Sequence, residues 1–233
     1  MKRREDVKRI HFQEIGSTNE YAKELRSLGQ DAVVTADRQM GGKGTKGRSF
    51  SSNEGGVYVT KLSFYRDFPA KEAFKIMAGA AVAVCETLEF YGLSPVIKWV
   101  NDIYVNDKKI CGILIENVFS GNTVASSIVG IGVNVCNALP KELENIAITM
   151  AQALKNPPSV AEVRERLIEN LSKPKGVDEY LRRIGYMGRQ ATVVFGEESM
   201  PATLLSVDRE GGLWAEIDGE KRRFAAAEVS LKL

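Results

Sequence analysis

Hydrophobic and polar residues follow one another along the chain in patterns that predict helices and strands in mixed order. Between residues 70 and 91, apolar side chains recur at helical spacing, at Phe74, Met77, Ala78, Ala81, Cys85 and Leu88. We therefore expect a helix that packs against the core. Further helices are predicted at 17–28, with Ser17 or Thr18 as N-cap, and at 160–171 and 177–184. Strands are predicted at 31–36, 57–64, 96–100, 110–116 and 126–133.

The pattern changes after Gly185 to short strands separated by turn residues. We expect these strands at 191–195, 202–207, 213–217, 222–226 and 229–231. The dipeptide Asp218-Gly219 is a strong signal for a hairpin between the third and fourth of them. Five closely spaced short strands indicate a small barrel of the SH3 type. The sequence therefore predicts an α+β protein with a main domain over 1–187 and a small β-barrel domain over 188–233.

Composition and charge exclude several other classes of protein. The chain is 44% hydrophobic and 27% charged with a net charge of only +2, which is typical of a globular protein and does not require a nucleic-acid partner. The basic N-terminus leads into no apolar segment with a cleavage site, and no apolar run is long enough to cross a membrane. We expect a cytoplasmic protein with neither a DNA nor a membrane partner.

Cysteine and histidine give no sign of disulfides or of a metal site. Cys85, Cys111 and Cys136 lie far apart, and His11 is the single histidine. Such scattered cysteines in a cytoplasmic chain are typical of buried apolar positions, so no metal ligands are assigned.

A glycine-rich basic loop at residues 41–50, GGKGTKGRSF, is the first candidate site. Glycines allow close backbone approach to a ligand, successive free N–H groups form an anion nest, and Lys43, Lys46 and Arg48 add positive charge. The loop matches neither common phosphate-binding pattern. By itself it is equally consistent with a surface loop whose charges are solvated.

A second group of polar residues lies at predicted strand ends, in KWVND at 98–102 and KICGILIE at 109–116. Taken singly, Asn101-Asp102 and Asn106-Asp107 fit turns, and Lys109 fits a solvated charge at a strand edge. Their joint presence with the basic loop favours a binding site.

Together these segments resemble the biotin–protein ligases. That family has a GRGRxGRxW loop, a KWPND segment and a KxxGxLxE segment, which this chain matches in order with GKGTKGRSF, KWVND and KICGILIE. STN at 17–19, Gln39 ahead of the loop and GIGVNV at 130–135 match further family segments. Lys43, Thr45, Phe50 and Val100 depart from the family's two loop arginines, its tryptophan and its proline.

The resemblance implies the class II aminoacyl-tRNA synthetase/biotin ligase fold, with a mixed sheet, for the main domain. It also implies a two-step reaction, in which biotin and ATP form biotinyl-5′-AMP and a lysine of an acceptor protein then takes the biotin. Lys109, Asp102 and Arg48 are the catalytic residues implied: Lys109 between carboxylate and α-phosphate, Arg48 at the phosphates, and Asp102 at the acceptor amine. Glycines in the loop suit closure over an intermediate that water would hydrolyse.

Two sets of binding residues follow from the resemblance. The biotin-binding set is Ser17, Thr18, Asn19, Gln39, Gly42, Lys43, Gly44, Thr45, Trp99, Lys109 and Gly112, with Trp99 as an apolar wall. The ATP-binding set is Lys46, Arg48, Phe50, Asn101, Lys109 and Asn134. Mg²⁺ is expected with the triphosphate, held by phosphate oxygens and water. The implied acceptor is a biotin carboxyl carrier protein or domain, and a homodimer is possible.

Three alternatives remain at this stage. A lipoate–protein ligase shares the fold and chemistry but resembles the chain less at KWVND and at the loop. A biotin-responsive repressor would carry a helix-turn-helix domain before Ser17, and only 16 residues precede it. A non-catalytic interaction module would leave the clustered polar residues unexplained.

Overall fold

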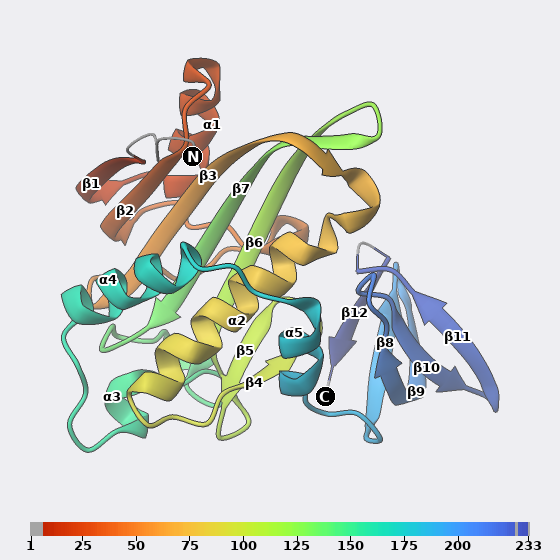
Figure 1. Ribbon diagram of the computed structural model, residues 1–233. Helices are drawn as coiled ribbons and strands as arrows, with labels where there is room; N and C mark the ends of the chain where they lie inside the picture. Colours follow the sequence, from red (N-terminus) through yellow and green to blue (C-terminus); the bar gives the residue numbers. More distant parts are fainter. Residues whose placement is uncertain (1–6, 227, 233) are drawn as a thin grey trace.

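The larger of two β-sheets forms the centre of the molecule (Figure 1). The computed structural model describes residues 7–226 and 228–232. The seven strands of the larger sheet are β1 (Lys8–Ile15), β2 (Ala32–Gln39), β3 (Gly56–Pro69), β4 (Val96–Lys98), β5 (Asp102–Val105), β6 (Lys108–Ser120) and β7 (Thr123–Asn134). Their order is β1-β2-β3-β7-β6-β5-β4. Because β1 and β2 pair in parallel and the other neighbours are antiparallel, the predicted mixed sheet is confirmed.

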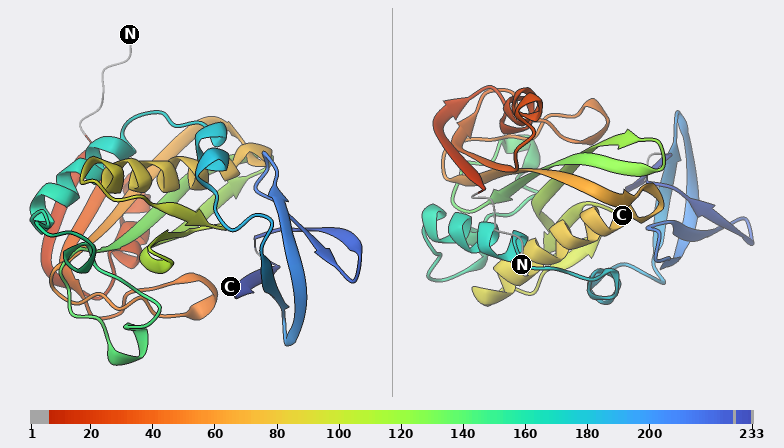
Figure 2. Two further views of the ribbon diagram at one scale, coloured as in Figure 1. Left: turned by 90° about the horizontal axis from the view of Figure 1, so that it is seen from below. Right: turned by 45° about the horizontal axis from the view of Figure 1, so that its top comes forward.

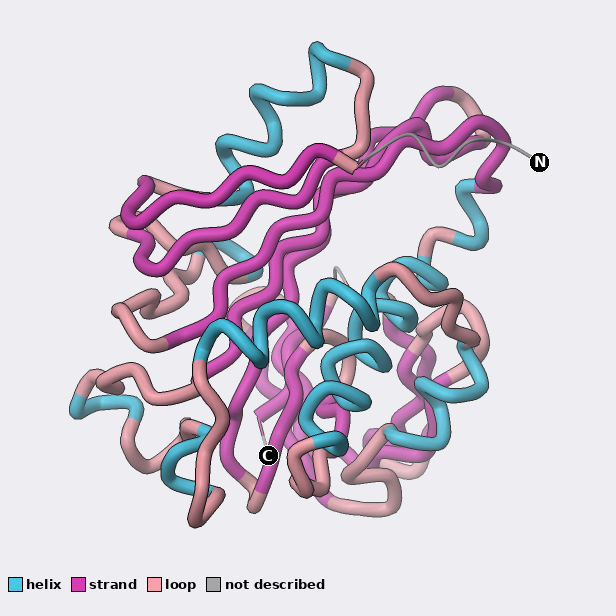
Figure 3. The backbone as a smooth tube through the Cα atoms, turned by 60° about the vertical axis from the view of Figure 1, so that its left-hand side comes forward, coloured by secondary structure: helices cyan, strands magenta, loops and turns pink. Residues whose placement is uncertain are grey.

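Helices lie on both faces of this sheet, and Figure 3 shows them against the long central strands. The helices are α1 (Thr18–Leu25), α2 (Phe74–Phe90), α3 (Met150–Ala153), α4 (Val160–Leu171) and α5 (Val177–Arg183). Helix α2 packs on β5 and β6 and carries the predicted apolar stripe, with Ala78, Ala81 and Cys85 fully buried. Helix α1 begins after Ser17, whose hydroxyl accepts from the backbone N–H of Glu20. In the part of the chain described, no helix is long and apolar enough to cross a bilayer.

The second sheet stands at one end of the first (Figure 2). Its strands are β8 (Gln190–Phe195), β9 (Glu198–Val207), β10 (Leu213–Ile217), β11 (Glu220–Phe224) and β12 (Val229–Lys232), all paired antiparallel. The predicted hairpin is confirmed, with positive φ angles of 52° at Asp218 and 81° at Gly219. Five strands therefore form where the barrel was expected. The predicted boundary at 187/188 lies between α5 and β8.

Three parts of the fold differ from the prediction. Strand β1 was not predicted, although Ile10 and Phe12 pack on a small apolar cluster beneath it. Charged residues at its ends obscure the alternation of this edge strand. Asp102 is not turn material but the first residue of β5, where it pairs with Gly112. The predicted helix at 70–91 starts with a separate 3-10 turn, Ala70–Glu72, so α2 itself begins at Phe74.

Candidate active site

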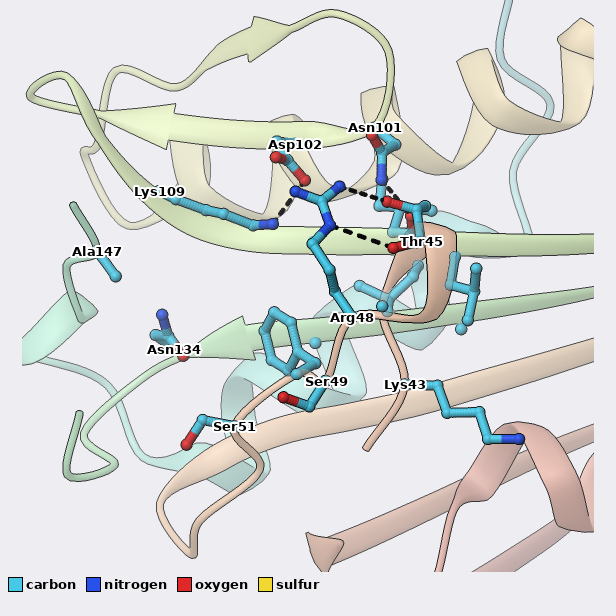
Figure 4. A pocket seen from close by; sticks show the side chains of 18 of the residues that line it. Lys43, Thr45, Arg48, Ser49, Ser51, Asn101, Asp102, Lys109, Asn134 and Ala147 are labelled. Atoms are coloured by element: carbon cyan, nitrogen blue, oxygen red, sulfur yellow. Dashed lines mark hydrogen bonds and ion pairs between the residues drawn. The ribbon is translucent and has the colours of Figure 1, made fainter. Parts of the chain in front are cut away.

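A pocket of about 410 Å³ brings together the segments singled out by the sequence (Figure 4). Its walls come from the start of α1, the loop at 43–51, strands β4 to β7 and the segment 139–147. Of the predicted site residues, those that line it are Ser17, Thr18, Asn19, Gln39, Lys43, Gly44, Thr45, Arg48, Phe50, Asn101, Asp102, Lys109, Gly112 and Asn134. The volume is within the range of small-molecule sites.

Lys109 and Asp102 form an ion pair inside this pocket. The Lys109 Nζ lies 2.7 Å from the Asp102 Oδ1, and both side chains are largely buried. The backbone of Lys109 is held on both sides by a segment that the sequence did not indicate: its N–H donates to the Ile146 carbonyl, and its carbonyl accepts from the Ile148 N–H, each at 2.9 Å. The ammonium is thus directed into the pocket from a fixed backbone.

Arg48 extends from the glycine-rich loop toward this ion pair (Figure 4). Its Nε donates to the Thr45 carbonyl at 3.2 Å and its Nη2 to the Thr45 hydroxyl at 2.8 Å. Thr45, which replaces an arginine of the family pattern, therefore orients the neighbouring cation. These contacts leave the positive charge of Arg48 directed at the pocket without a carboxylate partner among the described residues.

Lys43 ties the same loop to helix α1. Its Nζ lies 2.5 Å from the Glu20 Oε1, and Lys23 contacts the same oxygen at 2.8 Å. These two lysines lower the pKa of Glu20, so the carboxylate stays ionised and the contact persists at neutral pH.

Glycines on β6 and β7 form the floor of the pocket. Gly112 and Gly132 pair across the two strands, and the Phe50 ring lies over both. A Cβ on Gly112 would lie 3.1 Å from the Phe50 ring and 3.2 Å from the Lys109 Nζ, while one on Gly132 would overlap the ring. One residue pair further along, Gly130 leaves room for the carboxamide of Asn19. Side chains at these positions would therefore displace Phe50, Lys109 or Asn19 from the pocket wall.

The end of the pocket beside α1 is polar. The Thr18 N–H and hydroxyl both donate to the Gln39 Oε1, at 2.8 and 2.9 Å. The buried Thr60 Oγ1 lies 2.7 Å from both the Thr18 Oγ1 and the Asn19 Oδ1, and the Asn19 amide donates to Glu116 at 3.3 Å. Thr60 and Glu116 were not predicted as site residues: Thr60 belongs to no recognised motif, whereas Glu116 ends the KICGILIE segment, which could have identified it.

Asn101 and Asn134 lie along the β6–β7 part of the pocket wall. The Asn101 amide donates to the Ile113 carbonyl at 2.7 Å, and the Asn101 carbonyl accepts from the Ile113 N–H. The Asn134 Oδ1 accepts from Asn137 at 3.2 Å. Both residues line the pocket while bracing its backbone.

Three predicted site residues do not line the pocket. Trp99 is buried on the other side of the chain, where its indole N–H donates to the Gly211 carbonyl at 2.9 Å and links the two sheets. The preceding residue, Lys98, faces the pocket, and adjacent side chains of an extended chain point in opposite directions. Lys46 has a left-handed φ of 55° that turns it into solvent. Gly42 is packed against Phe50 and Ser52 and so supports the loop from behind.

Several residues that line the pocket were not predicted. They are Ser49, Ser51, Lys98, Tyr104, Ile113, Leu114, Gly130, Ile131, Gly132, Leu139, Leu143, Ile146 and Ala147. Lys98 and the glycines of β7 stand inside recognised motifs, which could have identified them. Within the described residues, no three His, Cys, Asp or Glu side chains are grouped as metal ligands.

The mixed sheet and this cationic pocket with a glycine floor define an enzyme that binds an anionic, nucleotide-sized substrate. Comparison with known proteins gives the family. The chain belongs to the Biotin/lipoate A/B protein ligase family, whose pattern matches residues 11–134.

Relatives and solved structures are consistent with this membership. The bifunctional ligase/repressor BirA of Bacillus subtilis is 30% identical over an alignment of 240 positions that covers 95% of this chain and 73% of the relative. A biotin–[acetyl-CoA-carboxylase] ligase of Paracoccus denitrificans is 32% identical over an alignment of 136 positions that covers 52% of each chain. The biotin protein ligase of Aquifex aeolicus, solved in complex with biotin and ATP, is 28% identical, with a TM-score of 0.75 over 97% of this chain and 98% of that one.

Proposed function

We propose that the protein is an ATP-dependent biotin–protein ligase, which makes biotinyl-5′-AMP and transfers the biotin to a lysine of an acceptor protein. The observation that carries the proposal is the convergence of Lys109, Asp102 and Arg48 on one pocket with a glycine floor and a polar end. The Paracoccus relative is a biotin–[acetyl-CoA-carboxylase] ligase and the Aquifex biotin protein ligase was solved with biotin and ATP, which favours biotin over lipoate.

In the first step, a biotin carboxylate oxygen attacks the α-phosphorus of ATP and the bond to the β-phosphate breaks, releasing pyrophosphate. Two anions must approach one another, and cations between them lower the barrier. Lys109 is directed at this space by its fixed backbone, and Arg48 is held beside it by Thr45. We assign Lys109 to the carboxylate and the α-phosphate, and Arg48 to the phosphates. Mg²⁺ would enter with the nucleotide as part of the substrate.

In the second step, the neutral amine of the acceptor lysine attacks the carbonyl carbon of the mixed anhydride, and the bond to the phosphate oxygen breaks to release AMP. The attacking nitrogen loses a proton, which needs an acceptor. Asp102 is suited to this role once Lys109 has turned to the phosphate, since its second oxygen has no protein partner among the described residues. The acceptor expected is a biotin carboxyl carrier domain.

The polar end beside α1 suits the ureido ring of biotin. The network of Thr18, Asn19, Gln39 and Thr60 offers hydroxyl and amide groups whose positions are fixed by mutual hydrogen bonds. Gly130, Gly132 and Gly112 line the pocket between this end and Lys109. A pocket organised before binding reduces the entropy lost by the ligand.

Biotin-dependent exchange of labelled pyrophosphate into ATP tests the proposal directly. We expect exchange with biotin and none without it, because the first step is reversible and needs no acceptor. Exchange that requires lipoate or octanoate in place of biotin would replace the proposed substrate. No exchange with any of the three acids would refute the proposed reaction.

Trypsin should cut the glycine-rich loop more slowly when biotin and ATP are both present. The loop carries cleavage sites at Lys43, Lys46 and Arg48, and closure over an adenylate would bury its backbone. Cleavage is followed by mass spectrometry, with a site outside the loop, at Lys155, as the internal control. Equal rates at the loop with and without the two ligands would contradict closure.

A further inference from the structure

Lys98 is a pocket cation to which neither the sequence nor the mechanism above assigns a role. It ends β4, is half-buried, and lines the pocket. Lys109 and Lys43 each contact a carboxylate. Among the described residues, Lys98 has no carboxylate within ion-pair distance. Its Nζ instead donates a hydrogen bond to the Tyr104 Oη at 3.3 Å.

The partner of Lys98 is uncharged. Burial is the main cause that raises the pKa of Tyr104, to about 12, so the phenol stays protonated at neutral pH. A phenol oxygen orients the ammonium without cancelling its charge. An ammonium has three N–H donors, and this contact uses one of them. Lys98 therefore keeps both its charge and spare donors for a ligand in the pocket.

The surroundings of Lys98 favour an anion. Burial, and then repulsion from Lys109 and Arg48, lower the pKa of Lys98, while Asp102 opposes this effect. The cations of Lys98, Lys109 and Arg48 thus lie near a single carboxylate, that of Asp102. Such an arrangement is unfavourable while the pocket is empty of anions, and a polyanionic ligand between the three cations would relieve the repulsion.

Tyr104 is itself held by the segment that leads to the second sheet. Its ring packs edge-on against Tyr186, with ring centres 6.0 Å apart. The Tyr186 hydroxyl donates to Asp107 at 3.2 Å, and the Arg189 guanidinium lies 5.2 Å from the centre of the Tyr186 ring. Tyr186 adopts a left-handed φ of 68°, which is uncommon for an aromatic residue, so its placement depends on these contacts.

We propose that Lys98 binds the phosphate groups of the nucleotide substrate, and that Tyr104 and Tyr186 position it. The inference rests on the proposed function in so far as ATP is the nucleotide. Lys98 would neutralise charge on the triphosphate and on the departing pyrophosphate. The segment between α5 and β8 would thereby contribute to phosphate binding in a pocket that it does not line.

Direct binding measurements test the role of Lys98. Lys98→Met removes the charge with little loss of volume, and Lys98→Arg restores the charge. We expect Lys98→Met to weaken binding of inorganic pyrophosphate and of ATP by roughly tenfold or more, with biotin affinity within about twofold of the parent protein. Lys98→Arg should recover part of the loss. Lys75→Met is the matched control, because Lys75 lies on α2 outside the pocket and pairs with Glu72.

Unchanged pyrophosphate and ATP affinities in Lys98→Met would overturn the proposal. An equal loss of biotin affinity would also overturn it, since that result indicates general damage to the pocket. Because binding of pyrophosphate is measured without turnover, a Lys98-dependent loss would stand even if the wild-type protein showed no biotin-dependent exchange. Failure of the proposed function is thus distinguishable from failure of this inference.

The positioning role is tested at Tyr186. Tyr186→Leu removes the ring that supports Tyr104, whereas Tyr186→Phe removes only the contact with Asp107. We expect Tyr186→Leu to raise the KM for ATP several-fold with a smaller effect on kcat and on the KM for biotin. Tyr186→Phe should raise the KM for ATP less than Tyr186→Leu does. A lower melting temperature in Tyr186→Leu with an unchanged KM for ATP would show that the ring is merely structural.

Discussion

Lys109→Ala should lower biotin-dependent pyrophosphate exchange by between about 10²- and 10³-fold, the loss typical of removing one fixed charge stabiliser from a transition state. The Lys109 Nζ is the cation closest to Asp102, and its backbone is clamped by Ile146 and Ile148. Exchange is measured at saturating biotin and ATP, so that weaker binding does not imitate a loss of rate.

Two further variants separate catalysis from folding. Lys108→Ala changes the neighbouring lysine, whose Nζ donates to the Glu144 carbonyl, and exchange should remain near that of the parent protein. Lys109→Arg keeps the positive charge beside Asp102 but replaces a compact ammonium by a larger, planar guanidinium, so we expect intermediate activity. Near-normal exchange in Lys109→Ala would remove Lys109 from the catalytic role.

The sequence predicted which residues form the site better than it predicted the directions in which individual side chains point. The spacing of glycines and cations in the recognised motifs was enough to predict that Arg48, Asp102 and Lys109 come together, because neighbouring strands of a sheet place such residues side by side. The direction of a side chain depends on local backbone geometry. Trp99 therefore points into the junction between the sheets, and the left-handed turn directs Lys46 to solvent.

Other parts of the pocket could not be predicted because they depend on long-range packing. Thr60 meets Asn19 only through the pairing of β3 with its neighbours, and the segment 146–148 joins Lys109 only after the chain has returned from β7. Neither carries a periodic pattern or a motif. The apolar residues Leu139, Leu143 and Ile146 line the pocket from a segment for which no element was predicted.

Gly130→Ala should damage both stability and biotin binding, because an added methyl group would overlap the Asn19 carboxamide, whose Cγ lies 2.8 Å from the Cβ position. Asn19 is buried and tied to Thr60 and Glu116, so it cannot move without breaking those hydrogen bonds. Overpacking of this kind costs about 1–3 kcal/mol of unfolding free energy. We also expect biotin affinity to fall by about tenfold or more, since Asn19 faces the polar end of the pocket.

Gly79→Ala is the matched control, since the same methyl group should there have the opposite effect on stability. Gly79 lies within α2, and the nearest heavy atom to an added Cβ, on Lys175, is 3.9 Å away. Alanine in a helix interior is favoured over glycine by about 0.5–1 kcal/mol, so unfolding by urea should shift to higher denaturant concentration while biotin binding stays unchanged. If Gly130→Ala unfolds at the same urea concentration as the parent protein and binds biotin equally well, then Asn19 adapts freely. The polar end of the pocket would then not be the fixed surface that biotin recognition requires.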